Sequence, residues 1–329
     1  MDRSAGASST SRPKRSPGSP PSGPASSRSG SPGSGLGRSA LKALARRHGI
    51  RPSKTLGQNF LADPNMARAI VADAGVTASD RVVEVGAGLG SLTLPLASTG
   101  AQVVAVEFDR ALADALSEVL APHPNVRQVA GDALRLDWDE LLEVGPSEGA
   151  GSSSERGWKM VSNLPYNIAV PLLLDLLERV PAIRDLVVVI QREVGDRLVA
   201  SAGDDAYGAV SLRVAYRARP ELVRRISADV FWPRPNVGSV LVRLTPQPPP
   251  VDADPTLLFR VIDRSFAERR KTMTNALRRL GVGPDRAVRI LRACSVPPRA
   301  RPEDLDLDAY ARVSDRLIEE GLVPEGADR

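Results

Sequence analysis

The stretch Val82-Val83-Glu84-Val85-Gly86-Ala87-Gly88-Leu89-Gly90 decides the fold class. Its first four residues have the β-branched, apolar character of a short buried strand. Three glycines then alternate with other residues before a helical segment at residues 91–97. Because glycine lets a backbone come close to a ligand at a strand-to-helix turn, the stretch predicts an α/β fold with a ligand at the end of this strand.

Short β-branched runs recur along the chain and are separated by helical segments. They lie at residues 103–106, 126–129, 160–161 and 186–190. This alternation favours a mostly parallel sheet with helices on both faces. Ligands of such sheets bind beyond the carboxyl ends of the strands.

Two acidic residues follow strands at that edge. Glu107 ends the second strand, where an acidic side chain commonly binds ribose hydroxyls, and Asp132 after the third could accept a hydrogen bond from an adenine amino group. Glu84 either joins them or braces the turn through backbone N–H groups. The order G-x-G-x-G differs from the dinucleotide fingerprint G-x-G-x-x-G and resembles S-adenosylmethionine-dependent methyltransferases, with a nicotinamide dinucleotide as the alternative ligand.

The tetrad Asn163-Leu164-Pro165-Tyr166 follows the short run at residues 160–161. The lone pair of an adenine amino group is delocalised into the ring, so this nitrogen is a poor nucleophile. An Asn oxygen and a backbone carbonyl can each accept one of its N–H bonds, which favours a pyramidal nitrogen, and Tyr166 can stack on the ring. The alternative is a plain strand-to-turn junction.

The charge of the chain is concentrated at its N-terminus. Lys and Arg exceed Asp and Glu by 44 to 39, and residues 1–40 hold six of the cations against one acid, so the remainder is formally neutral. We expect a disordered Ser/Pro/Gly/Arg-rich tail at 1–40, a methyltransferase domain at 41–246 and a helical domain at 247–329. The helical domain is expected to contain helices at 257–280, 286–293 and 307–320, and residues 145–154 look like a surface insertion.

Several classes of protein are disfavoured. The lone Cys294 cannot form an intramolecular disulfide, which fits a reducing cytoplasm, and two histidines with one cysteine make a dedicated zinc site a poor fit. The chain has no apolar run near the roughly 20 residues that span a bilayer. Neither a metal nor a membrane is therefore expected to take part.

The segment Lys54-Thr55-Leu56-Gly57-Gln58-Asn59-Phe60-Leu61, taken with the glycine turn and the tetrad, resembles the bacterial small-subunit ribosomal RNA adenine N6,N6-dimethyltransferases, the kasugamycin-resistance dimethyladenosine transferase family. Further matches lie at 191–194, 207–208, 231–240 and 266–277, so the resemblance covers nearly everything from residue 50 to 320. The Leu in the tetrad is usual in this branch, whereas macrolide-resistance relatives more often have another residue there.

The resemblance implies a Rossmann-like class I methyltransferase sheet with a small all-helical C-terminal domain, and S-adenosylmethionine as cofactor. The residues that would contact the cofactor are Asn59, Leu61, Gly86, Glu107, Asp132 and Asn163. The catalytic set would be Asn163, Leu164, Pro165, Tyr166 and Phe231. In it an aromatic residue, Phe231 in preference to Trp232, would face the target adenine opposite Tyr166. Phe60 and Leu61 could equally be core anchors.

The implied reaction is dimethylation of N6 in two adjacent adenines of a loop near the 3′ end of 16S rRNA, late in small-subunit biogenesis. The expected partner is small-subunit rRNA in an assembly intermediate, bound by a cytoplasmic monomer. Two basic clusters could contact its phosphates. They consist of Lys42, Arg46, Arg47, Arg51 and Lys54, and of Arg269, Arg270, Lys271, Arg278 and Arg279.

Three alternatives remain open. One is a large-subunit (23S) rRNA dimethyltransferase that confers macrolide resistance. Another is a ribosome assembly factor whose catalysis is dispensable. An NAD-dependent oxidoreductase is the most distant.

Overall fold

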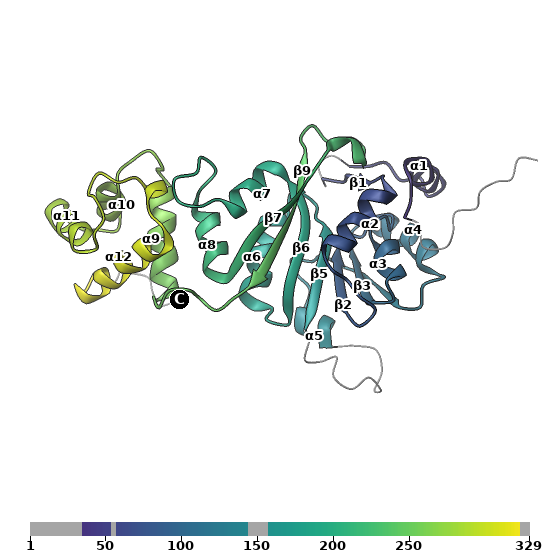
Figure 1. The fold of residues 1–329 in the computed structure, drawn as a ribbon, viewed down its shortest axis with the longest axis horizontal. Coiled ribbons are helices and arrows are strands. Elements are labelled where there is room, and N and C mark those ends of the chain that lie inside the picture. Colours follow the sequence, from purple (N-terminus) through teal and green to yellow (C-terminus); the bar gives the residue numbers. More distant parts are fainter. Residues whose placement is uncertain (1–34, 54–56, 144–156, 323–329) are drawn as a thin grey trace, which may run out of the picture. The chain divides into compact units, whose positions relative to one another are not determined.

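Seven strands form the central sheet of the computed structural model, which describes residues 35–53, 57–143 and 157–322 (Figure 1). The strands are β2 (Arg81–Val85), β3 (Gln102–Glu107), β4 (Val126–Ala130), β5 (Trp158–Asn163), β6 (Ile183–Gln191), β7 (Ala218–Ile226) and β9 (Ser239–Pro246). Their order across the sheet is β4-β3-β2-β5-β6-β9-β7. The first five run parallel to one another and β9 is antiparallel to both of its neighbours, which confirms the α/β fold.

Alternate residues of each strand point to opposite faces of the sheet, and each face has its own core. Val83 and Met160 belong to the core formed with α5 (Trp138–Glu143), α6 (Ala169–Arg179), α7 (Arg192–Val199) and α8 (Ala209–Arg217). Val82 and Val161 belong to the core formed with α2 (Pro64–Asp73) and the start of α3 (Thr93–Ser98). Helix α4 (Arg110–Leu120) packs against β3 and β4.

Four helices follow the sheet: α9 (Pro255–Phe266), α10 (Met273–Arg279), α11 (Pro284–Ala293) and α12 (Leu307–Glu319). Short 3₁₀ turns lie at Ala228–Val230 and Pro302–Asp304. The core of these helices also contains Tyr207, Leu212 and Tyr216, which precede residue 247. The division at residue 246 therefore stays a prediction.

The prediction of one continuous helix over 257–280 is wrong, because residues 267–272 form turns between α9 and α10. Arg269 lies in these turns, and its guanidinium donates to Glu303 at 3.0 Å and to the Asp205 carbonyl at 2.8 Å. Arg269, Arg270 and Lys271 consequently do not share a helix face with Arg278 and Arg279.

The expected tail at 1–40 lies outside the described residues up to residue 34, and helix α1 (Arg38–Arg47) already begins within its remainder. The insertion at 145–154 and Lys54 also lie outside them. In the part of the chain that is described, no helix has the length and apolar character needed to cross a membrane.

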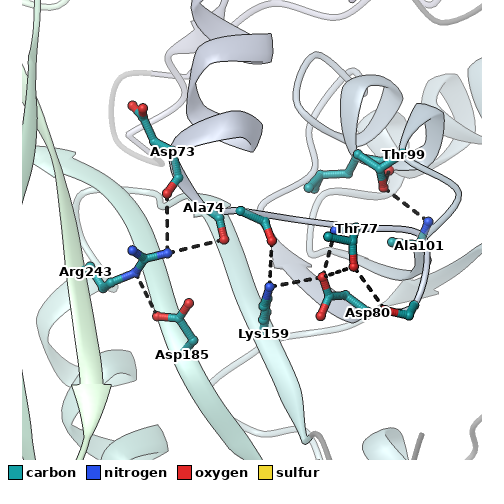
Figure 2. A network of polar contacts seen from close by, with 12 residues as sticks. Asp73, Ala74, Thr77, Asp80, Thr99, Ala101, Lys159, Asp185 and Arg243 are labelled. Carbon is teal, nitrogen blue, oxygen red and sulfur yellow. Dashed lines mark hydrogen bonds and ion pairs between the residues drawn. The ribbon is translucent and has the colours of Figure 1, made fainter.

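A polar network joins the end of α2 to the amino ends of the parallel strands β5 and β6 and to the neighbouring part of β9 (Figure 2). The Arg243 guanidinium donates to the Asp185 carboxylate at 3.1 Å and to the carbonyls of Asp73 and Ala74 at 3.3 Å. The last carbonyls of a helix lack partners within it and favour a cation nearby. Arg243 thus caps α2 while it pairs with an acid of β6.

Lys159 makes the second half of this network. Its ammonium donates to the Gly75 carbonyl at 2.8 Å and to Asp80 at 3.0 Å, and Asp80 also accepts from the Thr77 backbone and hydroxyl. Burial alone would raise the pKa of Asp80, but the Thr77 and Lys159 donors hold it below its ordinary value. The carboxylate therefore stays charged and fixes the turn after α2.

We predict that Arg243→Ala lowers the free energy of unfolding by roughly 2 kcal/mol at pH 7, because it leaves a buried carboxylate without its cation. The Asp185 side chain is only 19% exposed, and burial already raises its pKa against the opposing effect of Arg243. Without Arg243 this pKa rises further, so the deficit relative to wild type should shrink as the pH falls and Asp185 is protonated. Urea unfolding at pH 4.5, 6 and 7.5 measures it.

The matched control is Arg243→Ala combined with Asp185→Asn, which removes the titrating group. The double variant should recover part of the stability lost at pH 7. Its difference in unfolding free energy from wild type should not shrink as the pH falls. A deficit of Arg243→Ala that is the same at every pH would contradict the assigned pairing.

Candidate functional site

A cavity of about 320 Å³ opens at the carboxyl ends of β2, β3, β4 and β5. Its lining comes from residues 57–60, 85, 86, 88, 106–109, 112, 131–134 and 163–168. Eight of the residues singled out from the sequence meet in it: Asn59, Gly86, Glu107, Asp132, Asn163, Leu164, Pro165 and Tyr166. Segments far apart in the chain thus share one site.

Leu61 and Phe231 are not brought to the cavity, contrary to expectation. Strand β1 (Phe60–Leu61) pairs antiparallel with β8 (Phe231–Trp232), with Leu61 opposite Phe231. Both of these side chains are buried in the core beneath α2. Because neighbouring strand residues point to opposite sides, Phe60 faces the cavity instead, and its ring lies 5.9 Å from that of Trp232.

The glycine turn touches two walls of the cavity at once. A Cβ on Gly86 would lie 2.9 Å from Pro165 Cδ, and a Cβ on Gly88 would lie 3.0 Å from the Phe60 ring. Both glycines also have positive φ, 75° and 57°. Only glycine therefore permits both the backbone conformation and the close approach.

Glu107 is fixed by backbone donors of the turn and of its own loop. Its Oε2 accepts from Gly88 N at 2.7 Å and its Oε1 from Asp109 N at 2.9 Å. Burial raises the pKa of Glu107, and these N–H groups oppose the rise because they favour the charged form. Each carboxylate oxygen keeps a second lone pair with which it could accept a ligand hydroxyl.

Glu84 lies beneath the turn and not in the cavity lining. It is fully buried, and its Oε2 has no hydrogen-bond partner among the described residues. Burial raises the pKa of Glu84 to about 8; the Thr93 hydroxyl opposes this rise and the Glu107 charge adds to it. This raised pKa favours the protonated form of Glu84 at neutral pH, and its carboxyl lies beneath the turn, outside the lining of the cavity.

The amide of Asn163 has a defined orientation. Its Nδ2 donates to the Asn59 carbonyl at 3.0 Å, and the Asn59 amide donates to the Gly57 carbonyl at 3.1 Å. With its N–H₂ group engaged, Asn163 presents Oδ1 as an acceptor. The segment that contains Asn59 thus orients the group best suited to receive an amine.

Two apolar residues at the cavity were missed from the sequence. Phe108 is 63% exposed and Leu134 is 39% exposed, and they follow Glu107 and Asp132 closely in the chain. Large apolar side chains this exposed commonly mark binding surfaces, and these could pack on a flat ring. The sequence signal for them is the large apolar residue that follows each of the two acids at the ends of strands. No group of three or more His, Cys, Asp or Glu side chains suited to a metal occurs within the described ranges.

Comparison with known proteins identifies relatives over most of the chain. The family described as "Ribosomal RNA adenine dimethylase" matches residues 50–318. The "Ribosomal RNA small subunit methyltransferase A" of Moorella thermoacetica is 43% identical over 277 residues, which cover 84% of this chain and 96% of the relative. The protein of the same name from Thermobifida fusca is 43% identical over 281 residues, covering 84% and 93%.

Solved structures share the fold at lower identity. A dimethyladenosine transferase from Plasmodium falciparum gives a TM-score of 0.64 at 21% identity, covering 80% of this chain and 98% of that one. The 23S rRNA methyltransferase ErmE gives 0.57 at 23% identity, covering 79% and 99%. These likenesses confirm the Rossmann-like methyltransferase sheet.

We predict that Glu84→Gln removes a pH dependence of stability. Because folding raises the pKa of Glu84 from its ordinary 4.5 to about 8, this group contributes its full stabilisation only below pH 4.5. The contribution declines as the unfolded chain ionises, and it is lost once the pH passes about 8. The stability of wild type relative to Glu84→Gln should therefore fall between pH 5 and 8 and then level off. Urea midpoints at pH 5, 7 and 9 measure this, and a constant difference would argue against a neutral buried Glu84.

Proposed function

The chain belongs to the ribosomal RNA adenine dimethylase family, and we propose that it transfers methyl groups from S-adenosylmethionine to N6 of two adjacent adenines near the 3′ end of small-subunit ribosomal RNA, twice on each base. The observation that carries the proposal is the Asn163 amide, oriented by the Asn59 carbonyl within the cavity. The small subunit is favoured by the names of relatives that are 40–43% identical over 84–89% of this chain.

The proposed cofactor position follows the chemistry of the lining. Glu107 would accept from the ribose hydroxyls and Asp132 from the adenine amino group, with Phe108 and Leu134 against the adenine ring. Asn59 and Gly86 would lie at the methionine end. S-adenosylmethionine, when bound, supplies an activated methyl group on its sulfonium.

The tetrad would bind the base that receives this methyl group. Asn163 Oδ1 accepts one N–H of the adenine amine. We assign the other N–H to the Leu164 carbonyl, because the Pro165 carbonyl already has one partner, Ile168 N at 3.2 Å. Hydrogen bonds from both N–H groups favour a pyramidal nitrogen with an available lone pair, while Tyr166 stacks on the ring. Alignment of nitrogen and methyl carbon supplies most of the acceleration, and the product proton leaves to water.

In this proposal Phe231 has a packing role and does not contact the base. Its burial opposite Leu61 fixes β8 against β1, and so fixes the segment that contains Asn59. Leu61 serves the same purpose from the other strand. We propose that the enzyme acts as a monomer on an assembly intermediate of the small subunit in the cytoplasm, where the buried Cys294 would stay reduced.

The test is methylation of small-subunit and of large-subunit particles, both from cells that lack the gene, followed by mass spectrometry of the RNA of each. Wild type should yield dimethyladenosine in small-subunit RNA alone. Asn163→Ala should lower the rate roughly 100-fold or more, because a group that stabilises the developing charge is lost. Its affinity for cofactor should stay close to wild type.

Three outcomes would contradict this assignment. Dimethyladenosine in large-subunit RNA would favour the macrolide-resistance activity. Full activity of Asn163→Ala would remove its role, and rescue of the deletion strain by an inactive Asn163→Ala would make assembly the main function.

A further prediction concerns the ribose contact. Glu107→Ala should weaken S-adenosylmethionine binding by roughly 10- to 100-fold in calorimetry, since a carboxylate that accepts two hydroxyls is lost. Glu140→Ala, an exposed acid of α5, is the matched control and should bind as wild type does. Unchanged affinity in Glu107→Ala would rule out the contact.

A further inference from the structure

Tyr166 makes a side-chain contact that the cofactor and base sites do not require. Its hydroxyl lies 3.0 Å from the hydroxyl of Ser239, within hydrogen-bond distance. Ser239 is the first residue of β9 and is buried. It does not line the cavity, and sequence reasoning assigned it no role.

The Ser239 hydroxyl has a rigid backbone beneath it. Ser239 pairs with Gln191 of β6 on one side and with Ile226 of β7 on the other. A residue between two paired strands has little freedom to move. Its side chain is therefore a fixed point relative to the sheet.

The other end of Tyr166 is attached to the same sheet. Asn163 pairs with Val189 of β6, and Leu164 N donates to the Val189 carbonyl at 3.1 Å. Gly57 lies against the backbone of Tyr166, since a Cβ there would come within 3.1 Å of Tyr166 N. With the backbone fixed in this way, rotation about the side-chain bonds is the main freedom left to the ring. The Ser239 hydrogen bond holds the hydroxyl end of the side chain and so restricts rotation about the Cα–Cβ bond, which would swing the ring away.

We propose that Ser239 is a positioning residue, whose hydroxyl holds the hydroxyl end of Tyr166 and so keeps the ring in the place from which it stacks on the target adenine. The inference rests on the proposed function, because it assigns Ser239 through the base that Tyr166 would bind. A ring already oriented loses less conformational freedom when the base arrives, so more of the stacking energy is available to align the amine.

Ser239 also connects two segments that resemble different motifs of the family. It lies near the end of the matched segment 231–240, which contains β8, the loop after it and the start of β9, while Tyr166 ends the tetrad after β5. The hydrogen bond therefore ties the tetrad to the end of that loop.

The kinetic test uses Ser239→Ala, Tyr166→Phe and the double variant, with methyl transfer to small-subunit particles measured under single turnover. Each single variant removes the same hydrogen bond from one end. We expect each to lower the rate about 3- to 10-fold, the worth of one such bond. In the Tyr166→Phe background, Ser239→Ala should have no further effect.

Two controls separate positioning from general structure. Ser265→Ala removes another buried serine hydroxyl, which donates within α9 to the Val261 carbonyl at 2.7 Å, and should leave the rate unchanged. Affinity for S-adenosylmethionine should be unchanged in every variant. A rate loss from Ser239→Ala that is equal in both backgrounds, or no loss at all, would overturn the proposal.

A second measurement does not depend on activity. The chain has four tyrosines, so protein labelled with 3-fluorotyrosine should give four ¹⁹F resonances, and Tyr166→Phe identifies one of them by its loss. Ser239→Ala should shift or sharpen that resonance and leave the other three in place. An unchanged Tyr166 resonance would overturn the anchoring role. If wild type transfers no methyl group yet the resonance shifts, the proposed function fails while the anchor stands.

Discussion

The close approach of the glycine turn to Pro165 and Phe60 is the constraint on which the cavity depends. Gly86 and Gly88 belong to the first βα connection of the sheet, Pro165 follows β5, and Phe60 lies in β1. A single additional carbon on either glycine would displace one of the other walls. The site therefore requires that two positions have no side chain, as much as it requires the polar groups around them.

Much of the fold follows from local pattern. The β-branched runs around Val82 and Val103 became β2 and β3 because buried parallel strands have few other ways to place such residues. Glu107 and Asp132 were expected together at one edge because parallel strands end on the same side, and the cavity contains both. Asn163 followed from the same rule, whereas the orientation of its amide depends on a carbonyl more than 100 residues away, about which no local pattern is informative.

The departures have physical reasons of the same kind. Strands β1 and β8 are two residues long, too short for a periodic signal, yet their pairing decides that Phe60 faces the cavity and that Leu61 and Phe231 do not. The break between α9 and α10 coincides with bonds of Arg269 to Glu303 and to the Asp205 carbonyl, which are tertiary contacts. Helical periodicity over 257–280 could not reveal them.

The polar network around Arg243 has a consequence for how the chain can change over time. The network lies at the amino ends of the parallel strands, whereas the cavity lies at their carboxyl ends. The length of these strands therefore separates the two. A substitution that breaks the network around Arg243 and Lys159 should therefore lower stability without altering the residues that line the cavity. Selection on stability and selection on activity can therefore act on opposite edges of the sheet.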